Sequence, residues 1–389
     1  MSGGKLAVNR ADKSLLTEWW FTIDGVLLTA LLALIATGLV LSLAASPAVA
    51  VRAGLPQYYF VTNHAMYSAL AIATMLAVSA LEPRRIRQLA LLVFAGSLGA
   101  MAFVHFYGAE INGARRWLSI GGHSLQPSEF AKPAFAILSG WLLAEAHDRP
   151  EMPGLPIAIV MAVVFAGLLV SQPDVGQTLL VLIVWSVLFF ASGQPLRRAA
   201  MIVAAGLVGV VAAYNVFQHV QFRVDRFFNP VPGDLTQIDR AMRSFAEGGF
   251  WGRGPGEGTI KTTLPDAHTD FIFAVVAEEY GIAACLALLT LFAFITGRLL
   301  LRAANEPDAA TRLGLTGLAL LFGLQSLINM GVNVGLLPAK GMTLPFISAG
   351  GSSMMAVAVT LGMALALARR RPGLDRLKKP ELMPSFPPA

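Results

Sequence analysis

Long apolar stretches alternate with polar segments along most of the chain. A helix needs about 20 predominantly apolar residues to cross the hydrocarbon core of a bilayer. Stretches of roughly that length occur ten times, at 23–45, 59–81, 88–106, 128–144, 154–171, 174–192, 199–219, 270–297, 313–335 and 350–368. The pattern predicts an all-α polytopic membrane protein, with ten transmembrane helices in a membrane domain over 23–371.

The two ends of the chain are expected to be tails. The first apolar stretch ends at SPAVA, which is similar to a signal-peptide cleavage site. Its apolar core is longer than that of a signal peptide and acids precede it, so we expect this helix to be retained after an N-terminal tail at 1–22. The C-terminal segment at 372–389 is rich in proline and charge, which is typical of a tail without regular structure.

The distribution of basic residues predicts the orientation. They gather in the tails and in alternate short loops, at Arg84, Arg85, Arg87, Arg197, Arg198, Arg298, Arg302, Arg312, Arg369, Arg370 and Arg371. By the positive-inside rule both termini are therefore cytoplasmic. The polar loops 107–126, 220–269 and 336–349 are then extracytoplasmic, the second of them between helices 7 and 8.

Composition agrees with a membrane protein and excludes other classes. Only 13% of the residues are charged and 56% are hydrophobic, with a mean hydropathy of +0.64, whereas a soluble domain carries about 25% charged residues. The net charge of +6 is explained by the cytoplasmic loops, so we expect no nucleic-acid partner. A single cysteine, Cys285, excludes an intramolecular disulfide and disfavours a thiolate metal site.

The stretch from Leu264 to Gly281, LPDAHTDFIFAVVAEEYG, places ionisable residues where a polar loop becomes an apolar helix. In a straight helix Glu278 would lie roughly 12 Å along the axis from Asp270, within the membrane. An acid at that depth normally faces a partner or a water-filled cavity. This stretch is therefore the first candidate for a functional site.

Two further polar clusters fall on the same side of the membrane. In NGARRWLSIGGHSLQPSEFAK, Pro127 is expected to open a helix that carries Glu129 and Lys132 on one face. A site that also includes the preceding Arg-Arg-Trp is one interpretation; pairing of Glu129 with Lys132 and with the helix dipole is the other. In QPDVGQ, Asp174 lies in a first helical turn, where dipole complementation is a sufficient alternative to a site.

The other two polar clusters are loop segments. Pro338, Lys340 and a Gly-Gly pair in LLPAKGMTLPFISAGGSS predict a broken, re-entrant segment, after which Ser352 could receive phosphate oxygens at a helix start. The aromatic spacing in 220–269 favours helices lying on the membrane, and its GRGPGEG glycines could cradle an anion. A solvated linker is the alternative for this loop. The acids and bases together would suit an anionic substrate carried by a lipid.

These motifs, in this order, resemble the SEDS (shape, elongation, division and sporulation) family of membrane proteins. The segments LPDAHTDFIFAVVAEEYG, NGARRWLSIGG, QPSEFAK, QPDVGQ and LPAKGMTLPFISAGGSS carry the resemblance, which spans about residues 20–371. The segments AKGMTLP and GGSS are more similar to the sequences of the division branch of the family than to those of the elongation branch. One departure is Ala349, where the family usually has tyrosine, so a contact by that ring is not expected here.

The resemblance implies an inverting peptidoglycan glycosyltransferase that polymerises lipid II, a lipid-pyrophosphate-linked disaccharide-peptide, at the outer face of the cytoplasmic membrane. It also implies a class B penicillin-binding transpeptidase and other division proteins as partners, and a location at the division septum. By motif position Asp270 takes the essential acidic role. Supporting polar positions fall to Arg116, Glu129, Lys132 and Asp174.

This reaction needs a base for the attacking hydroxyl and positive charge for the departing pyrophosphate. Asp270 is the expected base. It could instead accept a hydrogen bond or hold a divalent cation, Mg or Mn, because the sequence leaves the balance of its pKa shifts open. Arg116, Lys132 and Lys340 are the candidate pyrophosphate clamps, and His268 either tunes the site or is structural.

Two other classes of protein remain as alternatives. A lipid II flippase would also place charges within the membrane, although a transporter should carry them near the midplane with repeat symmetry. A division scaffold that only recruits the transpeptidase would not need the outer carboxylates. The crowding of charges at the outer face favours the enzyme.

Overall fold

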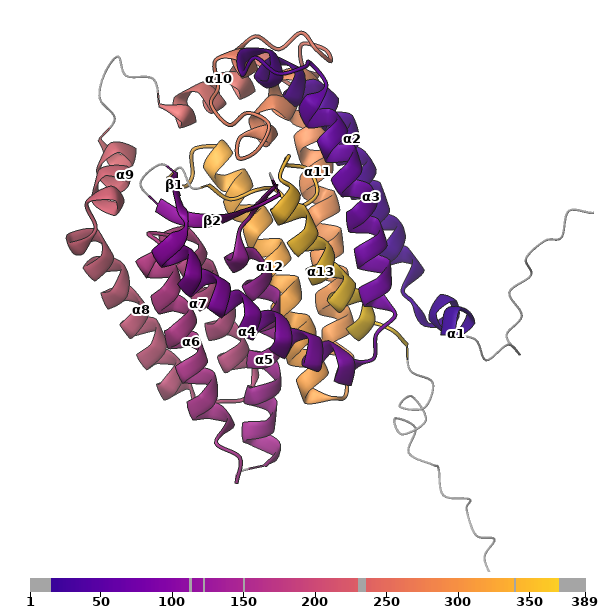
Figure 1. The fold of residues 1–389 in the computed structure, drawn as a ribbon, viewed down its shortest axis with the longest axis vertical. Helices are drawn as coiled ribbons and strands as arrows, with labels where there is room; N and C mark the ends of the chain where they lie inside the picture. Colours follow the sequence, from indigo (N-terminus) through magenta and orange to yellow (C-terminus); the bar gives the residue numbers. More distant parts are fainter. Residues whose placement is uncertain are drawn as a thin grey trace, which may run out of the picture.

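The structure is a computed structural model of the chain, and it describes residues 15–111, 114–121, 123–149, 151–229, 236–338 and 341–370. Every expected apolar stretch forms a helix, and these helices lie side by side in one bundle (Figure 1). They are α2 (Gly25–Arg52), α3 (Tyr59–Ser79), α4 (Pro83–Tyr107), α5 (Pro127–Asp148), α6 (Gly154–Ser171), α7 (Val175–Ala191), α8 (Leu196–Val216), α11 (Ile272–Ala304), α12 (Ala309–Asn333) and α13 (Gly351–Leu367). A short helix, α1 (Leu15–Thr22), precedes them.

The described helices are those of a polytopic membrane protein. Six are long and apolar enough to cross a membrane, namely α2, α3, α4, α6, α11 and α12. The apolar helices α7 and α13 are shorter, with 17 residues each. Apolar side chains on the outside of the bundle, such as Leu92 and Phe106 at 72% and 70% exposure, are compatible with contact to lipid.

Helix α5 forms the centre of the bundle. Its residues from Pro127 to Gly140 are buried almost without interruption, and it packs against α4, α6, α7, α12 and α13. An aromatic cluster joins it to α4 and α6, with the Phe135 ring centroid 6.0 Å from that of Phe94 and 5.2 Å from that of Phe165. The polar start of α5 is therefore held rigidly by its apolar remainder.

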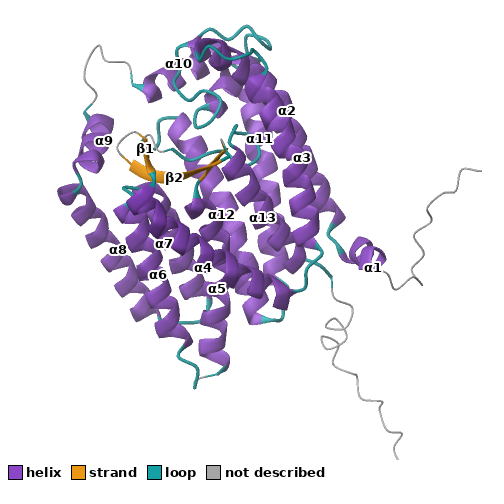
Figure 2. Ribbon diagram, viewed as in Figure 1, coloured by secondary structure: helices purple, strands orange, loops and turns teal. Residues whose placement is uncertain are grey.

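Loop 107–126 is not a simple loop. It forms a small antiparallel sheet in the order β1 (Ala109–Ile111), β2 (Ala114–Ile120) and β3 (His123–Leu125), coloured orange in Figure 2. Leu118 pairs with Leu125 across β2 and β3, and Gly121 at φ 59° turns the chain between them. The all-α prediction is therefore wrong for this segment, where the strands place β2 against the start of α5.

Loop 220–269 also contains regular structure. It holds most of α9 (Gln218–Phe228), then α10 (Gln237–Gly248) and a 3-10 turn, η1 (Ile260–Thr262). A capping box between Thr236 and Asp239 starts α10, which packs against the first part of α11. The helices expected in this loop are present, and their position on the membrane or in solvent stays a prediction.

Helix α11 bends sharply at Gly281, where φ is 79° and ψ is 179°. In a straight helix, residues 273 and 285 would be about 18 Å apart. Instead the Cys285 thiol lies 3.8 Å from the Phe273 carbonyl oxygen, so the segment before the bend folds back on the segment after it. The expectation that Glu278 lies along an uninterrupted transmembrane helix is therefore wrong. Glu278 lies at the bend, enclosed by the loop that follows α10.

Candidate active site

A cavity of about 1210 Å³ opens at the end of the bundle that carries α10 and the small sheet. Its wall is made by β2, the starts of α5, α7 and α13, helix α10 and the loops before α11 and α13. Of the site residues predicted from sequence, those that line this cavity are Arg116, Glu129, Asp174, Asp270 and Ser352. Residues up to 236 positions apart in sequence thus share one chamber.

Asp270 lies in the turn just before α11, and its side chain is half-buried. Among the described residues, no hydrogen bond or ion pair holds its carboxylate. Burial, together with the negative charge of Asp266, raises the pKa of Asp270 to about 7. A carboxyl group with that pKa can exchange a proton near neutral pH, as a general base or acid requires.

The loop that faces Asp270 comes close to its carboxylate. A β-carbon built on Gly341 would lie 3.3 Å from Asp270 Oδ2, so glycine leaves open the space beside that oxygen. Asp266 adopts a left-handed conformation with φ 53° and is exposed. The two carboxylates therefore belong to one turn and both line the cavity, with Asp266 the more exposed.

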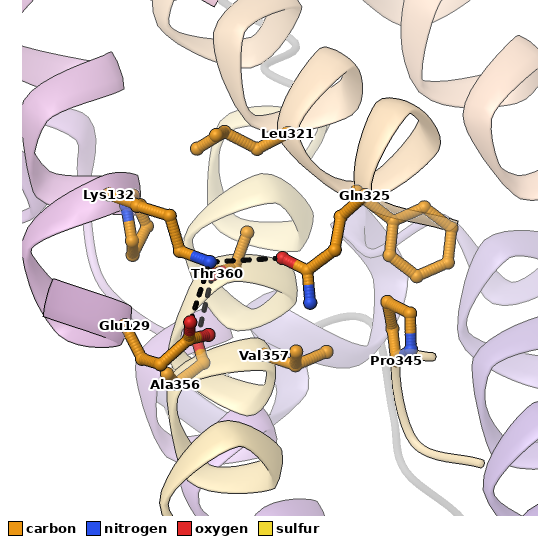
Figure 3. A pocket seen from close by; sticks show the side chains of 10 residues that line it. Glu129, Lys132, Leu321, Gln325, Pro345, Ala356, Val357 and Thr360 are labelled. Atoms are coloured by element: carbon orange, nitrogen blue, oxygen red, sulfur yellow. Dashed lines mark hydrogen bonds and ion pairs between the residues drawn. The ribbon is translucent and has the colours of Figure 1, made fainter. Parts of the chain in front are cut away.

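Glu129 and Lys132 form a buried polar network at the start of α5 (Figure 3). Lys132 Nζ donates to Glu129 Oε1 at 2.9 Å, to Gln177 Oε1 at 2.9 Å and to Gln325 Oε1 at 3.1 Å. Gln177 Nε2 also donates to Glu129 Oε1 at 2.9 Å. The three ammonium protons of Lys132 are thus used within the protein, and the expected pairing of Glu129 with Lys132 is present.

The network separates two cavities. Glu129 lines both the large cavity and a small one of about 20 Å³, whereas Lys132 lines the small one and is not among the residues that line the large one. That volume is enough for one water molecule. The geometry favours Lys132 as a support for Glu129, not as a direct clamp on a substrate in the large cavity.

Arg116 and Asp174 form a second charged pair on the cavity wall. Arg116 Nη1 lies 3.3 Å from Asp174 Oδ2, while Nε and Nη2 donate to the carbonyl oxygens of Gln172 and Pro173. Asp174 also caps α7 by accepting from Gln177 N at 3.3 Å, as dipole complementation predicted. Burial raises the pKa of Asp174 more than the nearby Arg116 lowers it. Arg116 therefore fixes the turn before α7 and adds positive charge to the wall.

The remaining predicted residues are placed differently. Ser352 Oγ accepts from Gln126 N at 2.9 Å, so its hydroxyl proton stays available to the cavity. His268 lies outside the cavity lining, with its ring 4.6 Å from that of Phe60, and burial lowers its pKa. Its neutral ring fits the structural alternative. Lys340 lies outside the described residues.

Several cavity residues were missed by the sequence analysis. Asp239 and Arg240 line the cavity from α10, and Arg240 Nη1 donates to the Thr263 carbonyl oxygen at 2.8 Å. Behind Asp270, α12 carries a polar stripe of Gln325, Asn329 and Asn333. Their spacing of four residues puts them on one face of an otherwise apolar helix, a pattern that could have identified them from sequence.

The donor set beside Asp270 fits a hard divalent cation only in part. Within the described part of the chain, no group of three or more His, Cys, Asp or Glu residues could hold a metal ion. Asp266 and Asp270 supply carboxylate oxygens, which Mg²⁺ and Mn²⁺ prefer. Magnesium commonly completes its shell with water and substrate phosphates, so this pair is a sufficient protein contribution.

Comparisons by sequence identify relatives of the whole chain. A sequence model of the FtsW, RodA and SpoVE family, described as cell cycle proteins, matches residues 25–372. The protein of Caulobacter vibrioides named probable peptidoglycan glycosyltransferase FtsW is 43% identical over 368 residues, which cover 94% of each chain. A protein of the same name from Geobacter sulfurreducens is 32% identical and covers 90% of this chain and 96% of its own.

Comparisons by structure give the same picture. A chain of a solved peptidoglycan synthase complex, described as coordinating polymerization and crosslinking, matches with a TM-score of 0.75 and 30% identity. The match covers 92% of this chain and 100% of that chain. The rod shape determining protein RodA of Thermus thermophilus matches with a TM-score of 0.64 and 28% identity, over 90% and 97% of the two chains. The likeness thus includes the bundle and the loops that build the cavity.

Proposed function

Because the chain belongs to the FtsW, RodA and SpoVE family of cell cycle proteins, we propose that it is a peptidoglycan glycosyltransferase that polymerises lipid II in cell division. The observation that carries the proposal is the Asp270 carboxyl group, which lines a cavity of about 1210 Å³ with a pKa of about 7. A cavity of this size can admit a disaccharide. The acid inside it has the proton affinity that the transfer requires.

Asp270 acts as the general base. It takes the proton of the 4-hydroxyl of one disaccharide while that oxygen attacks the anomeric carbon of the other glycan. The bond from this carbon to the pyrophosphate oxygen breaks, its electron pair leaves with the pyrophosphate, and the configuration inverts. Because the pKa of Asp270 is about 7, a large fraction of the carboxylate is ready to accept a proton at neutral pH.

Positive charge on the opposite wall stabilises the departing pyrophosphate. Arg240 has one donor bound to the Thr263 carbonyl oxygen, which leaves other guanidinium protons for an anion. Arg116 contributes its charge while it holds the turn before α7. Lys132 acts indirectly, because its ammonium group orients Glu129 and the two glutamines.

A divalent cation is the alternative role for Asp270. Asp270 and Asp266 would then hold Mg or Mn in place of base catalysis by Asp270, and such an ion would supply positive charge that neutralises pyrophosphate oxygens. The charged residues that line the cavity include five acids, Glu129, Asp174, Asp239, Asp266 and Asp270, and two arginines, Arg116 and Arg240. This surplus of acids makes an additional cation favourable when an anionic substrate enters.

The membrane arrangement is part of the proposal. We infer ten transmembrane spans, cytoplasmic tails and a cavity on the outer face, at the division septum. In support, Arg298 and Arg302 bind Asp24 at the start of α2, whereas Arg52 at the other end of α2 donates to the Thr262 carbonyl oxygen, in the loop that leads to Asp270. A class B penicillin-binding transpeptidase is the proposed partner, because a chain of a synthase complex shares the fold.

The decisive experiment compares purified wild-type protein and Asp270→Asn with lipid II, in the presence of the transpeptidase. We expect the variant to insert and fold, but to polymerise about 10²–10⁴-fold more slowly. Asp148→Asn, which removes an exposed acid at the far end of α5, is the control and should polymerise normally. Wild-type rates with Asp270→Asn would remove this residue from the chemistry. Transfer of lipid II across vesicles without any polymer would support the flippase alternative.

A further inference from the structure

Two asparagines of α12 hold the main chain of Asp270 from behind. Asn329 Nδ2 and Asn333 Nδ2 each donate to the Asp270 carbonyl oxygen at 2.9 Å. Both side chains are buried, with 2% and 0% exposure. A carbonyl oxygen that accepts two buried hydrogen bonds fixes the peptide plane that follows Asp270, and with it the direction of the residue.

Asn333 also holds the start of α11. The N-cap residue of this helix is Phe271, which has no side-chain acceptor. Asn333 Oδ1 accepts from Ala274 N at 3.0 Å, which is the third residue of the helix and the usual donor to an N-cap side chain. One amide from another helix therefore caps α11 with its oxygen and holds Asp270 with its nitrogen.

The same stripe fixes the loop that faces Asp270. Asn329 Nδ2 donates to the Met342 carbonyl oxygen at 2.6 Å, and Gln325 Nε2 donates to the Thr343 carbonyl oxygen at 3.1 Å. This loop includes Gly341, whose backbone approaches the Asp270 carboxylate. The width of the gap in which a sugar hydroxyl must meet Asp270 is therefore set by α12 from both sides.

We propose that Asn329 and Asn333 are positioning residues of the transfer reaction, which hold the Asp270 main chain so that the carboxylate faces the acceptor hydroxyl. The inference rests on the proposed role of Asp270. Neither asparagine is among the cavity-lining residues, so neither is expected to touch the substrate. Their effect should therefore fall on turnover more than on substrate binding.

Asn333→Asp is the most informative variant. It keeps the oxygen that caps Ala274, loses the donor to the Asp270 carbonyl oxygen when ionised, and brings a negative charge toward Asp270. A misplaced base costs on the order of 10- to 100-fold in rate, so we expect kcat for lipid II polymerisation to fall by that factor with KM nearly unchanged.

Asn329→Ala is the second variant. It removes the donors to the Asp270 and Met342 carbonyl oxygens without adding charge, so it should likewise lower kcat with KM nearly unchanged.

The control is Ser326→Ala on the same helix. Ser326 is buried but donates only to the Phe322 carbonyl oxygen of its own helix, so its kcat and KM should match the wild type. Normal kcat in both asparagine variants, with Asp270→Asn inactive, would overturn the positioning role alone. A loss of kcat no greater than the loss of folded protein, or a rise of KM with kcat unchanged, would also overturn it. Polymerisation by Asp270→Asn would instead overturn the proposed function.

Discussion

Two sets of acids in the same 18-residue stretch have opposite surroundings. Glu278 is fully buried, and its carboxylate accepts from the backbone N–H groups of Thr259, Ile260 and Lys261 at 2.6, 2.7 and 3.0 Å. Glu279 accepts from Gly256 N at 3.0 Å and pairs with the Lys261 ammonium group. Asp270 has no such partners among the described residues. Two buried acids are thus fixed by the protein, whereas the carboxylate of Asp270 is not held in the described part of the chain.

The difference also explains where each acid acts. The buried glutamates join the loop after α10 to the bend at Gly281, and Lys261 Nζ extends this contact to the Ala44 carbonyl oxygen of α2. Paired and hydrogen-bonded charges of this kind fix a structure. The raised pKa of Asp270 shows the reverse situation, in which the fold disfavours the charged form of the proposed base.

The largest expected effect, on activity and stability, comes from neutralising Asp270, whose carboxylate has no partner among the described residues, and Glu278, whose carboxylate is hydrogen-bonded. Asp270→Asn should lose about 10²–10⁴-fold in polymerisation rate but gain stability at pH 8. The pKa of Asp270 is above its unfolded value, so the stability cost of the charge is absent below pH 4 and complete above pH 7. Glu278→Gln should lose stability at pH 8 and keep a measurable rate while folded. Thermal unfolding of both variants at pH 5 and pH 8 checks the stability predictions. Polymerisation rates measured below the unfolding temperature check the activity predictions.

The next largest effect is expected on the free energy of unfolding when the Lys261–Glu279 ion pair is broken. Removing one partner of a buried ion pair costs about 3–5 kcal/mol, because the other charge is left without compensation. Lys261→Met should therefore lower the free energy of unfolding by that amount, measured in mixed detergent micelles. The double variant Lys261→Met with Glu279→Gln should recover part of the loss. A loss in the double variant equal to the sum of the losses in Lys261→Met and Glu279→Gln would show that the pair is not coupled.

A third effect concerns the bend that separates the two sets of acids. A β-carbon at Gly281 would lie 2.6 Å from the Phe250 carbonyl carbon, and φ is 79°, so Gly281→Ala should lose at least about 1–3 kcal/mol through backbone strain. The matched control is Gly297→Ala in the same helix, where a β-carbon meets nothing within 4 Å. That variant should be neutral, or more stable by up to about 1 kcal/mol. Thermal unfolding of the two variants side by side would detect the contrast.

The helices of the fold were predictable, whereas the bend and the sheet were not. A run of about 20 apolar residues has few alternatives to a helix in a bilayer, so each expected stretch was found. Gly281 looks like an ordinary glycine in an apolar run, and its bend depends on Phe250 and Gly252, which lie some 30 positions earlier. The strands of 109–125 are short and polar, and they form because β2 packs on α4 and α5.

The acids of the candidate site were predictable from the sequence, whereas the roles of the residues that hold them in place were less so. Motifs identified Asp270, Arg116 and Asp174, and all three line the cavity. The sequence could not show that all three ammonium protons of Lys132 are used within the protein, because its partners Gln177 and Gln325 come from two other helices. A site residue that acts on the cavity and one that supports it share the same local pattern, and only tertiary contacts separate them.

The smallest effect sharpens the comparison within the turn that carries Asp270. The negative charge of Asp266 contributes to the raised pKa of Asp270, so Asp266→Asn should lower that pKa toward its ordinary value. Activity requires the deprotonated base, and its rise with pH should therefore shift to lower pH. The shift should be below one pH unit, because burial, the larger cause, is unchanged and Asp266 is exposed to solvent. The pH profile of polymerisation at saturating lipid II measures it, and a shift to higher pH would show that Asp266 acts on the reaction through something other than its charge.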